Sequence, residues 1–193
     1  CHGLYLQRTI SSGNTGGAKY WTDGKMAASM LPRTPILIKC PHCEAILWSK
    51  EPKQVDSFET YLIRYVLEMD EKVKEAGIAE AEEKRARYEQ TPYYAIPTFQ
   101  DLNRYVQSGD ADGRDELKIR FHAWLTGNDA RRYSDNPSDL LPDEVANVAR
   151  IVALLGSKHV GYSALVLAEA YRELGKLAEA RSVIDSADLD SRE

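Results

Sequence analysis

Long apolar segments are absent from this 193-residue chain, and its cysteines are few. No apolar run approaches the roughly 18–20 residues that a membrane-spanning helix needs, which argues against a membrane protein. No charged segment followed by a short apolar stretch indicates a secretory signal either. The three cysteines form a small, odd-numbered set, which disfavours a disulfide framework. We therefore expect a cytoplasmic protein whose cysteines are reduced and available for metal or redox chemistry.

Charge is unevenly distributed along the chain. Hydrophobic residues make up 43% and charged residues 28% of the sequence, which is typical of a globular protein with one or two domains. The net charge is −5, yet residues 1–53 carry seven Lys and Arg against three Asp and Glu. The acidic remainder argues against a general nucleic-acid-binding protein, whereas the basic first part leaves that function open for itself.

The clearest chemical pattern is the segment Cys40-Pro41-His42-Cys43. Strand-favouring apolar residues precede it at 36–39 and follow it at 45–48. Two thiols separated by two residues are typical of zinc ligands on a tight turn. A metal ion there would close a hairpin that a sheet of about 50 residues cannot stabilise by apolar burial alone.

This segment resembles the second half of a zinc ribbon, a fold in which two Cys-x-x-Cys knuckles bind one metal ion. Cys40 and Cys43 match the second knuckle, and Cys1 stands where the last ligand of the first knuckle would be. The resemblance implies a structural Zn²⁺ held by Cys1, Cys40 and Cys43. The ligand three residues before Cys1 would precede this sequence, which does not begin with Met. Truncation, substitution by His2 and an incomplete site are the three alternatives.

A thiol or metal enzyme is a weaker interpretation of the same residues. A redox Cys-x-x-Cys requires its first thiol at a helix N-terminus, whereas a second strand is expected here. Catalytic zinc requires an open coordination position and a nearby general base. We expect His42 to face solvent and His122 to lie at a core boundary, and the four histidines form no catalytic constellation with Ser or Asp. The protein is therefore expected not to be an enzyme.

After residue 53 the sequence becomes helical. Apolar residues at spacings of three and four predict a long helix over residues 57–90, which Thr91-Pro92 ends. Its second half is rich in Ala, Glu, Lys and Arg and is expected to be solvated. Thr98 and Asp101 then form a capping pair for a short helix that extends to Val106.

Two further helices are expected before the C-terminal region. The first covers residues 115–125 and is predicted to stop at Gly127-Asn128. The second covers residues 145–155, begins with the favourable first turn at Pro142, and ends at Gly156.

The C-terminal region is the most regularly patterned part of the chain. Two helices joined at Gly175-Lys176 carry small residues at Ala168 and Ala180, with Tyr171 between turns. This pattern resembles the tetratricopeptide repeat (TPR), with one unit over residues 161–193. The resemblance implies that helices 145–155 and 115–125 pack behind this unit, because one repeat cannot bury its apolar face alone.

Aromatic residues alternate with basic ones in the first part of the chain, around a hairpin turn predicted at Asp23-Gly24. Such residues can form a surface for single-stranded nucleic acid. Small zinc ribbons, however, use aromatic residues to fill thin cores, and we favour that role here. The residues are Tyr5, Tyr20, Trp21 and Trp48, with Arg8, Lys19, Lys25, Arg33 and Lys39.

Together these patterns predict an α+β protein with a small β-rich, zinc-ribbon-like domain and a larger all-α domain. We place these domains at residues 1–53 and 92–193, joined by a connecting helix over 54–91. The architecture resembles that of bacterial proteins that join a zinc ribbon to a TPR-like unit. We expect a non-enzymatic scaffold with structural Zn²⁺, whose helical concavity near Tyr171 binds a protein or peptide partner.

The alternative is a nucleic-acid-associated zinc ribbon whose acidic helices recruit other proteins. It depends on the basic residues of 1–53 forming one accessible surface. No membrane partner is expected in either case.

Overall fold

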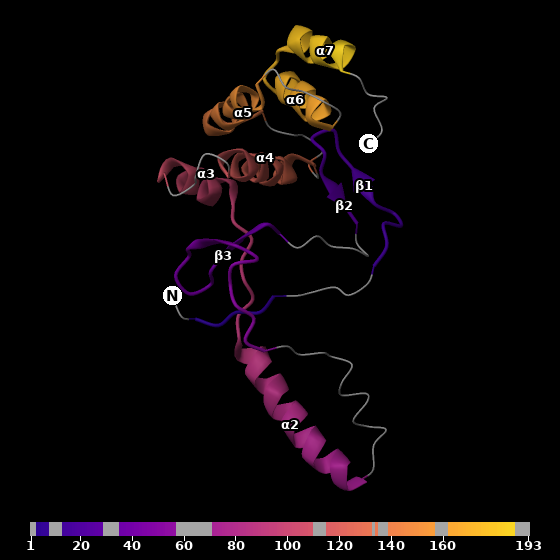
Figure 1. The fold of residues 1–193 in the computed structure, drawn as a ribbon, viewed down its shortest axis with the longest axis vertical. Helices are drawn as coiled ribbons and strands as arrows, with labels where there is room; N and C mark the ends of the chain where they lie inside the picture. The colour runs from indigo at the N-terminus through magenta and orange to yellow at the C-terminus, as the bar shows by residue number, and fades with distance from the viewer. Residues whose placement is uncertain are drawn as a thin grey trace. The chain divides into compact units, whose positions relative to one another are not determined.

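The computed structural model describes residues 3–7, 13–28, 35–56, 71–109, 115–132, 134, 139–156 and 162–187. The chain forms two compact units (Figure 1). The first, here the knuckle unit, comprises Cys1–Thr9 and Thr34–Ile96. The second, here the helical unit, comprises Ile10–Arg33 and Pro97–Glu193.

A two-stranded hairpin lies at the centre of the knuckle unit. Strand β3 (Leu37–Lys39) pairs antiparallel with β4 (Ile46–Trp48), with Ile38 opposite Leu47. Leu37 and Ile38 are buried, which explains why an apolar run forms this strand. Both strands and the intervening turn agree with the sequence-based prediction.

Two segments without regular structure lie alongside this hairpin. The Lys39 N–H donates to the Ala95 carbonyl at 2.8 Å, and the Ala95 N–H donates back at 3.0 Å. On the other side, the Leu6 N–H donates to the Pro92 carbonyl at 2.8 Å. Residues 92–95 therefore join the N-terminal segment 3–7 to strand β3.

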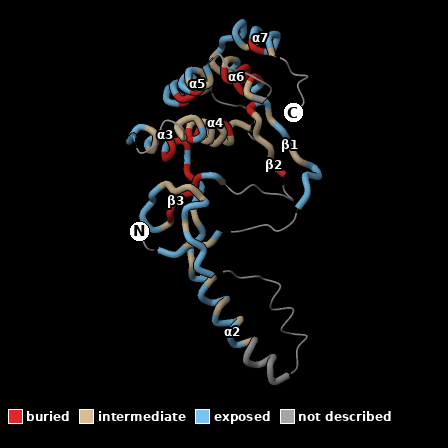
Figure 2. Tube along the Cα trace, in the orientation of Figure 1, coloured by how far each residue is buried: buried red, intermediate tan, exposed pale blue. Residues whose placement is uncertain are grey.

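Helix α2 (Glu71–Gln90) completes the described part of the knuckle unit. Most of its side chains from position 78 onward are exposed, as Figure 2 shows, in agreement with the predicted solvated helix. It ends at Gln90, before Thr91-Pro92, as predicted. The predicted segment 57–70 of this helix lies outside the described residues.

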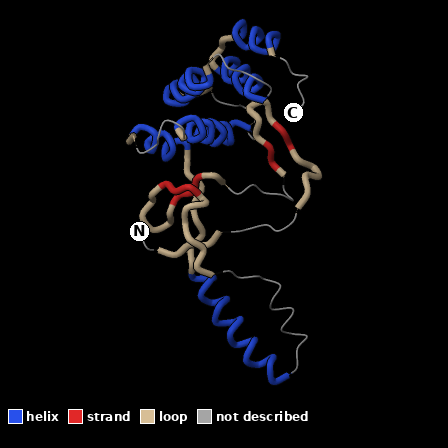
Figure 3. Tube along the Cα trace, in the orientation of Figure 1, coloured by secondary structure: helices blue, strands red, loops and turns tan. Residues whose placement is uncertain are grey.

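The helical unit contains helices that pack in chain order. Each helix contacts the next along the chain, so the predicted neighbours of the C-terminal pair are confirmed. Figure 3 shows these helices together with the short hairpin of residues 19–27, which belongs to the same unit. The helices are α3 (Phe99–Gln107), α4 (Glu116–Arg132), α5 (Pro142–Leu155), α6 (Tyr162–Glu173) and α7 (Leu177–Ser186).

Two apolar clusters stabilise this array. One joins α4, α5 and α6 through Trp124, Val148, Ile151, Val166 and Ala170. The other joins α6 and α7 through Ala164, Leu167, Ala168 and Val183. Burial of side chains of this size contributes about 1.5–3 kcal/mol each, so packing between helices outweighs their individual helix propensities.

The boundaries of several helices follow local signals in the sequence. Thr98 and Asp101 form the predicted capping box of α3, with the Thr98 N–H donating to Asp101 Oδ2 at 3.0 Å. Pro142 begins α5, and Gly156, with φ of 62°, ends it. Gly175, with φ of 72°, forms the turn between α6 and α7.

Helix α4 extends beyond its predicted end, so the predicted stop at Gly127-Asn128 is wrong. A Cβ at Gly127 would lie 2.6 Å from Glu144 Oε1, so glycine permits close contact with that carboxylate. Asn128 is buried and donates to Asp23 Oδ2 at 3.1 Å and Glu173 Oε1 at 2.9 Å. These tertiary contacts outweigh the roughly 1 kcal/mol that glycine costs inside a helix.

The second hairpin consists of β1 (Lys19–Tyr20) and β2 (Met26–Ala27). Gly24 has φ of 83°, and the Trp21 N–H donates to the Lys25 carbonyl at 2.9 Å, which confirms the predicted turn at Asp23-Gly24. This hairpin belongs to the helical unit. The division of the chain therefore differs from a boundary at residue 53, because side chains of the turn bind helices α4 and α6.

Two antiparallel strand pairs and the helices define an α+β fold, as the sequence predicts. Among the helices that the structure describes, none combines the length and apolar character needed to cross a membrane.

Glu116 links α4 to α5. Its carboxylate accepts from Arg120 Nε at 2.8 Å and from Arg150 Nε and Nη2, both at 3.0 Å. Hydrogen bonds from Arg150 and Arg120 outweigh the effect of burial and lower the pKa of Glu116 to about 2.

This depressed pKa predicts a specific pH dependence. The folded pKa lies below the ordinary value of 4.5, so Glu116 stabilises the fold above pH 4.5 and loses this contribution as the pH falls towards 2. Glu116→Gln should lower the free energy of unfolding at pH 7, and the difference from wild type should shrink between pH 4.5 and 2. Urea unfolding followed by circular dichroism measures it. Glu179→Gln, at an exposed position on α7, serves as the control, and an equal pH profile for both variants would contradict the prediction.

Candidate functional site

A groove of about 980 Å³ lies between the β1–β2 hairpin and helices α6 and α7 of the helical unit. Leu165, Glu169 and Arg172 recur along α6 at spacings of four and three and therefore share one helix face. Ala164 and Leu167 lie in the cluster that α6 shares with α7. The lining consists of Tyr20, Trp21, Thr22, Gly24, Met26, Leu165, Val166, Ala168, Glu169, Arg172, Ala180, Arg181 and Ile184.

A buried carboxylate joins the hairpin to α6 within the groove. Thr22 Oγ1 donates to Glu169 Oε1 at 2.6 Å. Arg172 donates to the same carboxylate through Nε at 2.7 Å and Nη2 at 2.8 Å. Burial raises the pKa of Glu169, but the hydrogen bonds from Arg172 and Thr22 outweigh burial and keep the pKa below its ordinary value. Glu169 is therefore an ionised, fully bonded part of the groove.

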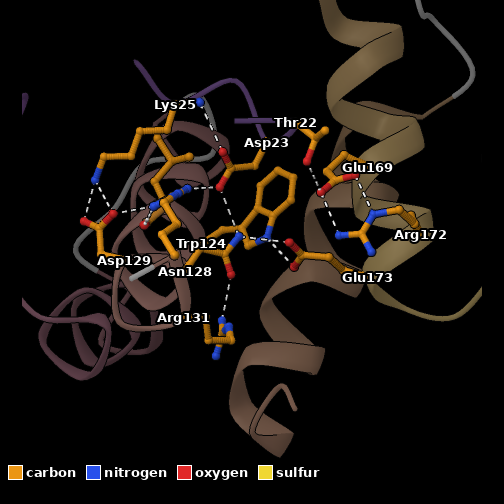
Figure 4. A network of polar contacts seen from close by, with 12 residues as sticks. Thr22, Asp23, Lys25, Trp124, Asn128, Asp129, Arg131, Glu169, Arg172 and Glu173 are labelled. Atoms are coloured by element: carbon orange, nitrogen blue, oxygen red, sulfur yellow. Dashed lines mark hydrogen bonds and ion pairs between the residues drawn. The ribbon is translucent and has the colours of Figure 1, made fainter. Parts of the chain in front are cut away.

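Asp23 fixes the hairpin turn to α4 (Figure 4). Its carboxylate accepts from Arg132 Nη2 and from Asn128 Nδ2, the latter at 3.1 Å. It also accepts from the Lys25 backbone N–H at 3.1 Å. Asp23 and Arg132 are both buried, so their charges compensate each other away from water.

Three further contacts hold the same turn. Lys25 Nζ forms an ion pair with Asp129, which also accepts from Arg132 Nη1. The Arg132 guanidinium lies 5.3 Å from the centre of the Trp21 ring, within range of a cation–π interaction. Trp21, which lines the groove, is thus packed against Arg132 of α4.

Asn128 connects this cluster to α6. It donates to Glu173 Oε1 at 2.9 Å, while Trp124 Nε1 donates to Glu173 Oε2 at 2.7 Å. Arg131 Nη2 donates to Asn128 Oδ1 at 2.7 Å, and Arg131 Nη1 donates to Glu144 Oε2 of α5 at 2.9 Å. Helices α4, α5 and α6 and the β1–β2 hairpin therefore share one polar network, much of which Figure 4 shows.

The sequence predicted a binding surface near Tyr171. It did not indicate that the β1–β2 hairpin also lines the groove. Tyr171 packs against the α6–α7 cluster, whereas its neighbour Arg172 lines the groove. The available signal in the sequence was a glutamate, Glu169, at the end of an apolar stretch and three residues before Arg172. His122 lies at a boundary position as expected, with its pKa lowered by burial and by the nearby Lys25.

The Cys40–Cys43 turn connects β3 to β4 and is closed by backbone hydrogen bonds. The Cys40 N–H donates to the Ala45 carbonyl at 2.9 Å, and the Glu44 N–H donates to the Cys40 carbonyl at 3.0 Å. Glu44 has φ of 60°, which reverses the chain direction. The backbone amide of His42 donates to the Cys40 sulfur and lowers the pKa of that thiol. Burial acts in the opposite direction and raises the pKa. A second hydrogen bond, from the Cys43 amide, lowers it further.

The N-terminal segment passes directly beside this turn. His42 is exposed, as expected, and its Nε2 lies 2.6 Å from the Leu4 carbonyl oxygen. A Cβ at Gly3 would collide with the His42 ring. The Tyr5 hydroxyl is buried without a hydrogen-bond partner among the described residues, and burial, followed by the charge of Cys40, raises its pKa.

The predicted ligand set of Cys1, Cys40 and Cys43 is described only in part. Cys40 is buried and Cys43 is exposed on the same turn. Cys1 and His2 lie outside the described residues. Within the described parts of the chain, no cluster of three or more Cys, His, Asp or Glu side chains is placed to hold a metal ion.

The predicted basic and aromatic surface is divided between the two units. Lys19, Tyr20, Trp21 and Lys25 lie in the helical unit, whereas Tyr5, Lys39 and Trp48 lie in the knuckle unit. Arg8 and Arg33 lie outside the described residues. Tyr20 is 70% exposed, so the expectation that it fills a core is wrong; a strand of two residues leaves it at the groove edge.

No family model, no curated protein and no solved structure matches this chain. The site must therefore be interpreted from its own geometry. The described lining combines apolar side chains with one compensated carboxylate and two arginines, an arrangement suited to binding.

Substitution of Asp23 should release the β1–β2 hairpin from α4. Asp23→Ala removes the buried carboxylate that accepts from Arg132 and Asn128 and should lower the free energy of unfolding by about 3 kcal/mol. Asp139→Ala is the control: Asp139 is exposed in the segment before α5, and its loss should change the free energy of unfolding by about 0.5 kcal/mol or less. Urea unfolding gives both values. Trypsin cleavage after Lys25 should accelerate in Asp23→Ala alone, and unchanged cleavage would contradict this role of Asp23.

Proposed function

We propose that the protein is a non-enzymatic scaffold that binds a peptide segment of a partner protein in the groove of its helical unit. The observation that carries this proposal is the groove itself, formed by the hairpin, α6 and α7. Its volume of about 980 Å³ is at the upper end of the range of ligand-binding pockets. A site of this size accommodates several side chains of an extended or helical segment.

Exposed apolar side chains in the groove support this function. Tyr20, Leu165 and Ile184 are large, apolar and solvent-accessible, and all three line it. Apolar side chains gathered in one concave surface are typical of interaction sites, because their burial by a partner is favourable.

The arrangement of helices supports the same proposal. Helix α6 contacts α7, and α5 and α4 follow in contact order, an order compatible with a TPR-like array. Arrays of this kind use extended concave surfaces for binding. The polar network fixes the hairpin before any partner arrives, which lowers the conformational entropy lost on binding.

We further propose that the knuckle unit contains a structural Zn²⁺ with Cys40, Cys43 and Cys1 as ligands. Amide N–H groups directed at the Cys40 sulfur support the thiolate form that zinc requires. Cys1 precedes Gly3 by two residues, a chain length of about 7 Å, and Gly3 lies against His42 of the knuckle. A reducing compartment such as the cytoplasm would keep these thiols available.

Peptide binding should depend on the apolar groove surface. An array of random 15-residue peptides probed with the full chain should identify ligands whose binding Leu165→Lys weakens at least about tenfold, because a charge replaces apolar contact area. Leu177→Lys is the matched control, since Leu177 is exposed on α7 and lies outside the groove lining. Absence of ligands for the wild-type chain, or equal effects of both variants, would refute the proposal.

The zinc proposal predicts metal content and a local effect of chelation. Elemental analysis should find one Zn²⁺ per chain, lost in Cys43→Ser but retained in His42→Ala, which removes a side chain bonded to Leu4. Chelation should accelerate hydrogen exchange of the β3–β4 amides and leave the amides of α4–α7 unchanged. A zinc-free wild-type chain, or exchange unaffected by chelator, would exclude this site.

A further inference from the structure

The charge of the groove lining identifies a chemical preference for its ligand. The charged side chains of the lining are Glu169, Arg172 and Arg181. Glu169 is buried and already bonded to Arg172 and Thr22. The lining therefore carries one net positive charge, because Glu169 compensates one of the two arginines.

Arg172 is held in a fixed orientation by its two bonds to Glu169. A guanidinium has five N–H donors, and these bonds occupy Nε and Nη2. The side chain is 56% exposed, so it can donate to an acceptor from solvent while the bonds to Glu169 persist. A guanidinium restrained in this way loses less conformational entropy on binding a second carboxylate than a mobile one.

Arg181 can leave its present ion pair with little loss of free energy. Its Nε lies 3.6 Å from Asp185 Oδ2, and the two side chains are 84% and 68% exposed. An ion pair so exposed contributes little to stability. Arg181 can therefore exchange this partner for a ligand carboxylate at the edge of the groove.

Small side chains lie among the apolar groups of the lining. Ala168 of α6 and Ala180 of α7 both line the groove, near the larger Trp21, Leu165 and Ile184. Two alanines leave volume that a large apolar side chain of a ligand can fill, with a gain of about 1.5–3 kcal/mol on full burial.

From these observations we propose that the groove selects peptides in which a bulky apolar residue is adjacent to Asp or Glu. The apolar side chain occupies the space beside Ala168 and Ala180, and the carboxylate binds Arg181 and Arg172. This inference rests on the proposed function, since it specifies the ligand of the same groove. The apolar contact supplies affinity, and the charge-assisted hydrogen bonds supply the selection.

Three peptide sets test this preference on the full chain. Each set consists of random 12-residue peptides with a fixed Leu-Glu, Leu-Gln or Leu-Lys pair at the centre. Wild-type protein should retain the Leu-Glu set about tenfold more strongly than the Leu-Gln set, and the Leu-Lys set least. Addition of 0.5 M NaCl, about three times physiological ionic strength, should reduce the advantage of the Leu-Glu set.

Charge reversal provides the second part of the test. Arg181→Glu should shift the preference towards the Leu-Lys set, whereas Arg181→Lys should keep the preference for Leu-Glu at a reduced level. Arg85→Glu is the matched control, because Arg85 is an exposed arginine on α2 of the knuckle unit. It should leave the order of the three sets unchanged.

The outcomes separate this inference from the proposed function. Equal retention of the Leu-Glu and Leu-Gln sets, with binding still abolished by Leu165→Lys, would overturn the charge preference and leave peptide binding intact. No retention of any set would overturn both. Self-association of the wild-type chain that Leu165→Lys abolishes would identify a second copy as the occupant and would also overturn the peptide preference.

Discussion

The place of the β1–β2 hairpin in the helical unit depends on one buried ion pair, between Asp23 in the hairpin turn and Arg132 at the end of α4. A hairpin with two residues in each strand has too little surface to hold its position alone. Burying a carboxylate is costly unless donors replace its water, and Asp23 accepts from Arg132, from Asn128 and from the Lys25 backbone. These bonds make the hairpin a fixed wall of the helical unit.

The same network determines the shape of the groove. Glu173 of α6 accepts from Asn128 and Trp124 of α4, and Glu169, one helical turn earlier on the same helix face, accepts from Thr22 of the hairpin. A shift of α6 would therefore disturb its bonds both to the hairpin and to α4. Polar groups that are fully satisfied in this way favour one arrangement over many, which is a requirement for a preorganised binding surface.

Local signals allowed much of the secondary structure to be predicted. The capping box at Thr98, the Asp23-Gly24 turn and the strands around Cys40 depend on interactions between residues close in sequence. The groove could not be predicted in this way. Thr22 and Glu169 are 147 positions apart, and nothing in either neighbourhood specifies the other. The extension of α4 through Asn128 has the same origin, because its partners lie in β1–β2 and α6.

The assignment of Ile10–Arg33 to the helical unit has a consequence for how the protein is made and divided. The helical unit is discontinuous in sequence, so a fragment beginning at residue 97 lacks the hairpin side chains that line the groove. During synthesis the hairpin emerges first. Asp23 can pair with Arg132 only after a further 109 positions have been synthesised. Contacts of such long range slow folding, because their loop-closure entropy is lost before they stabilise the chain. The N-terminal hairpin is thus the first part of the helical unit to be synthesised, yet it cannot complete its contacts until α6, which carries Glu169, has emerged.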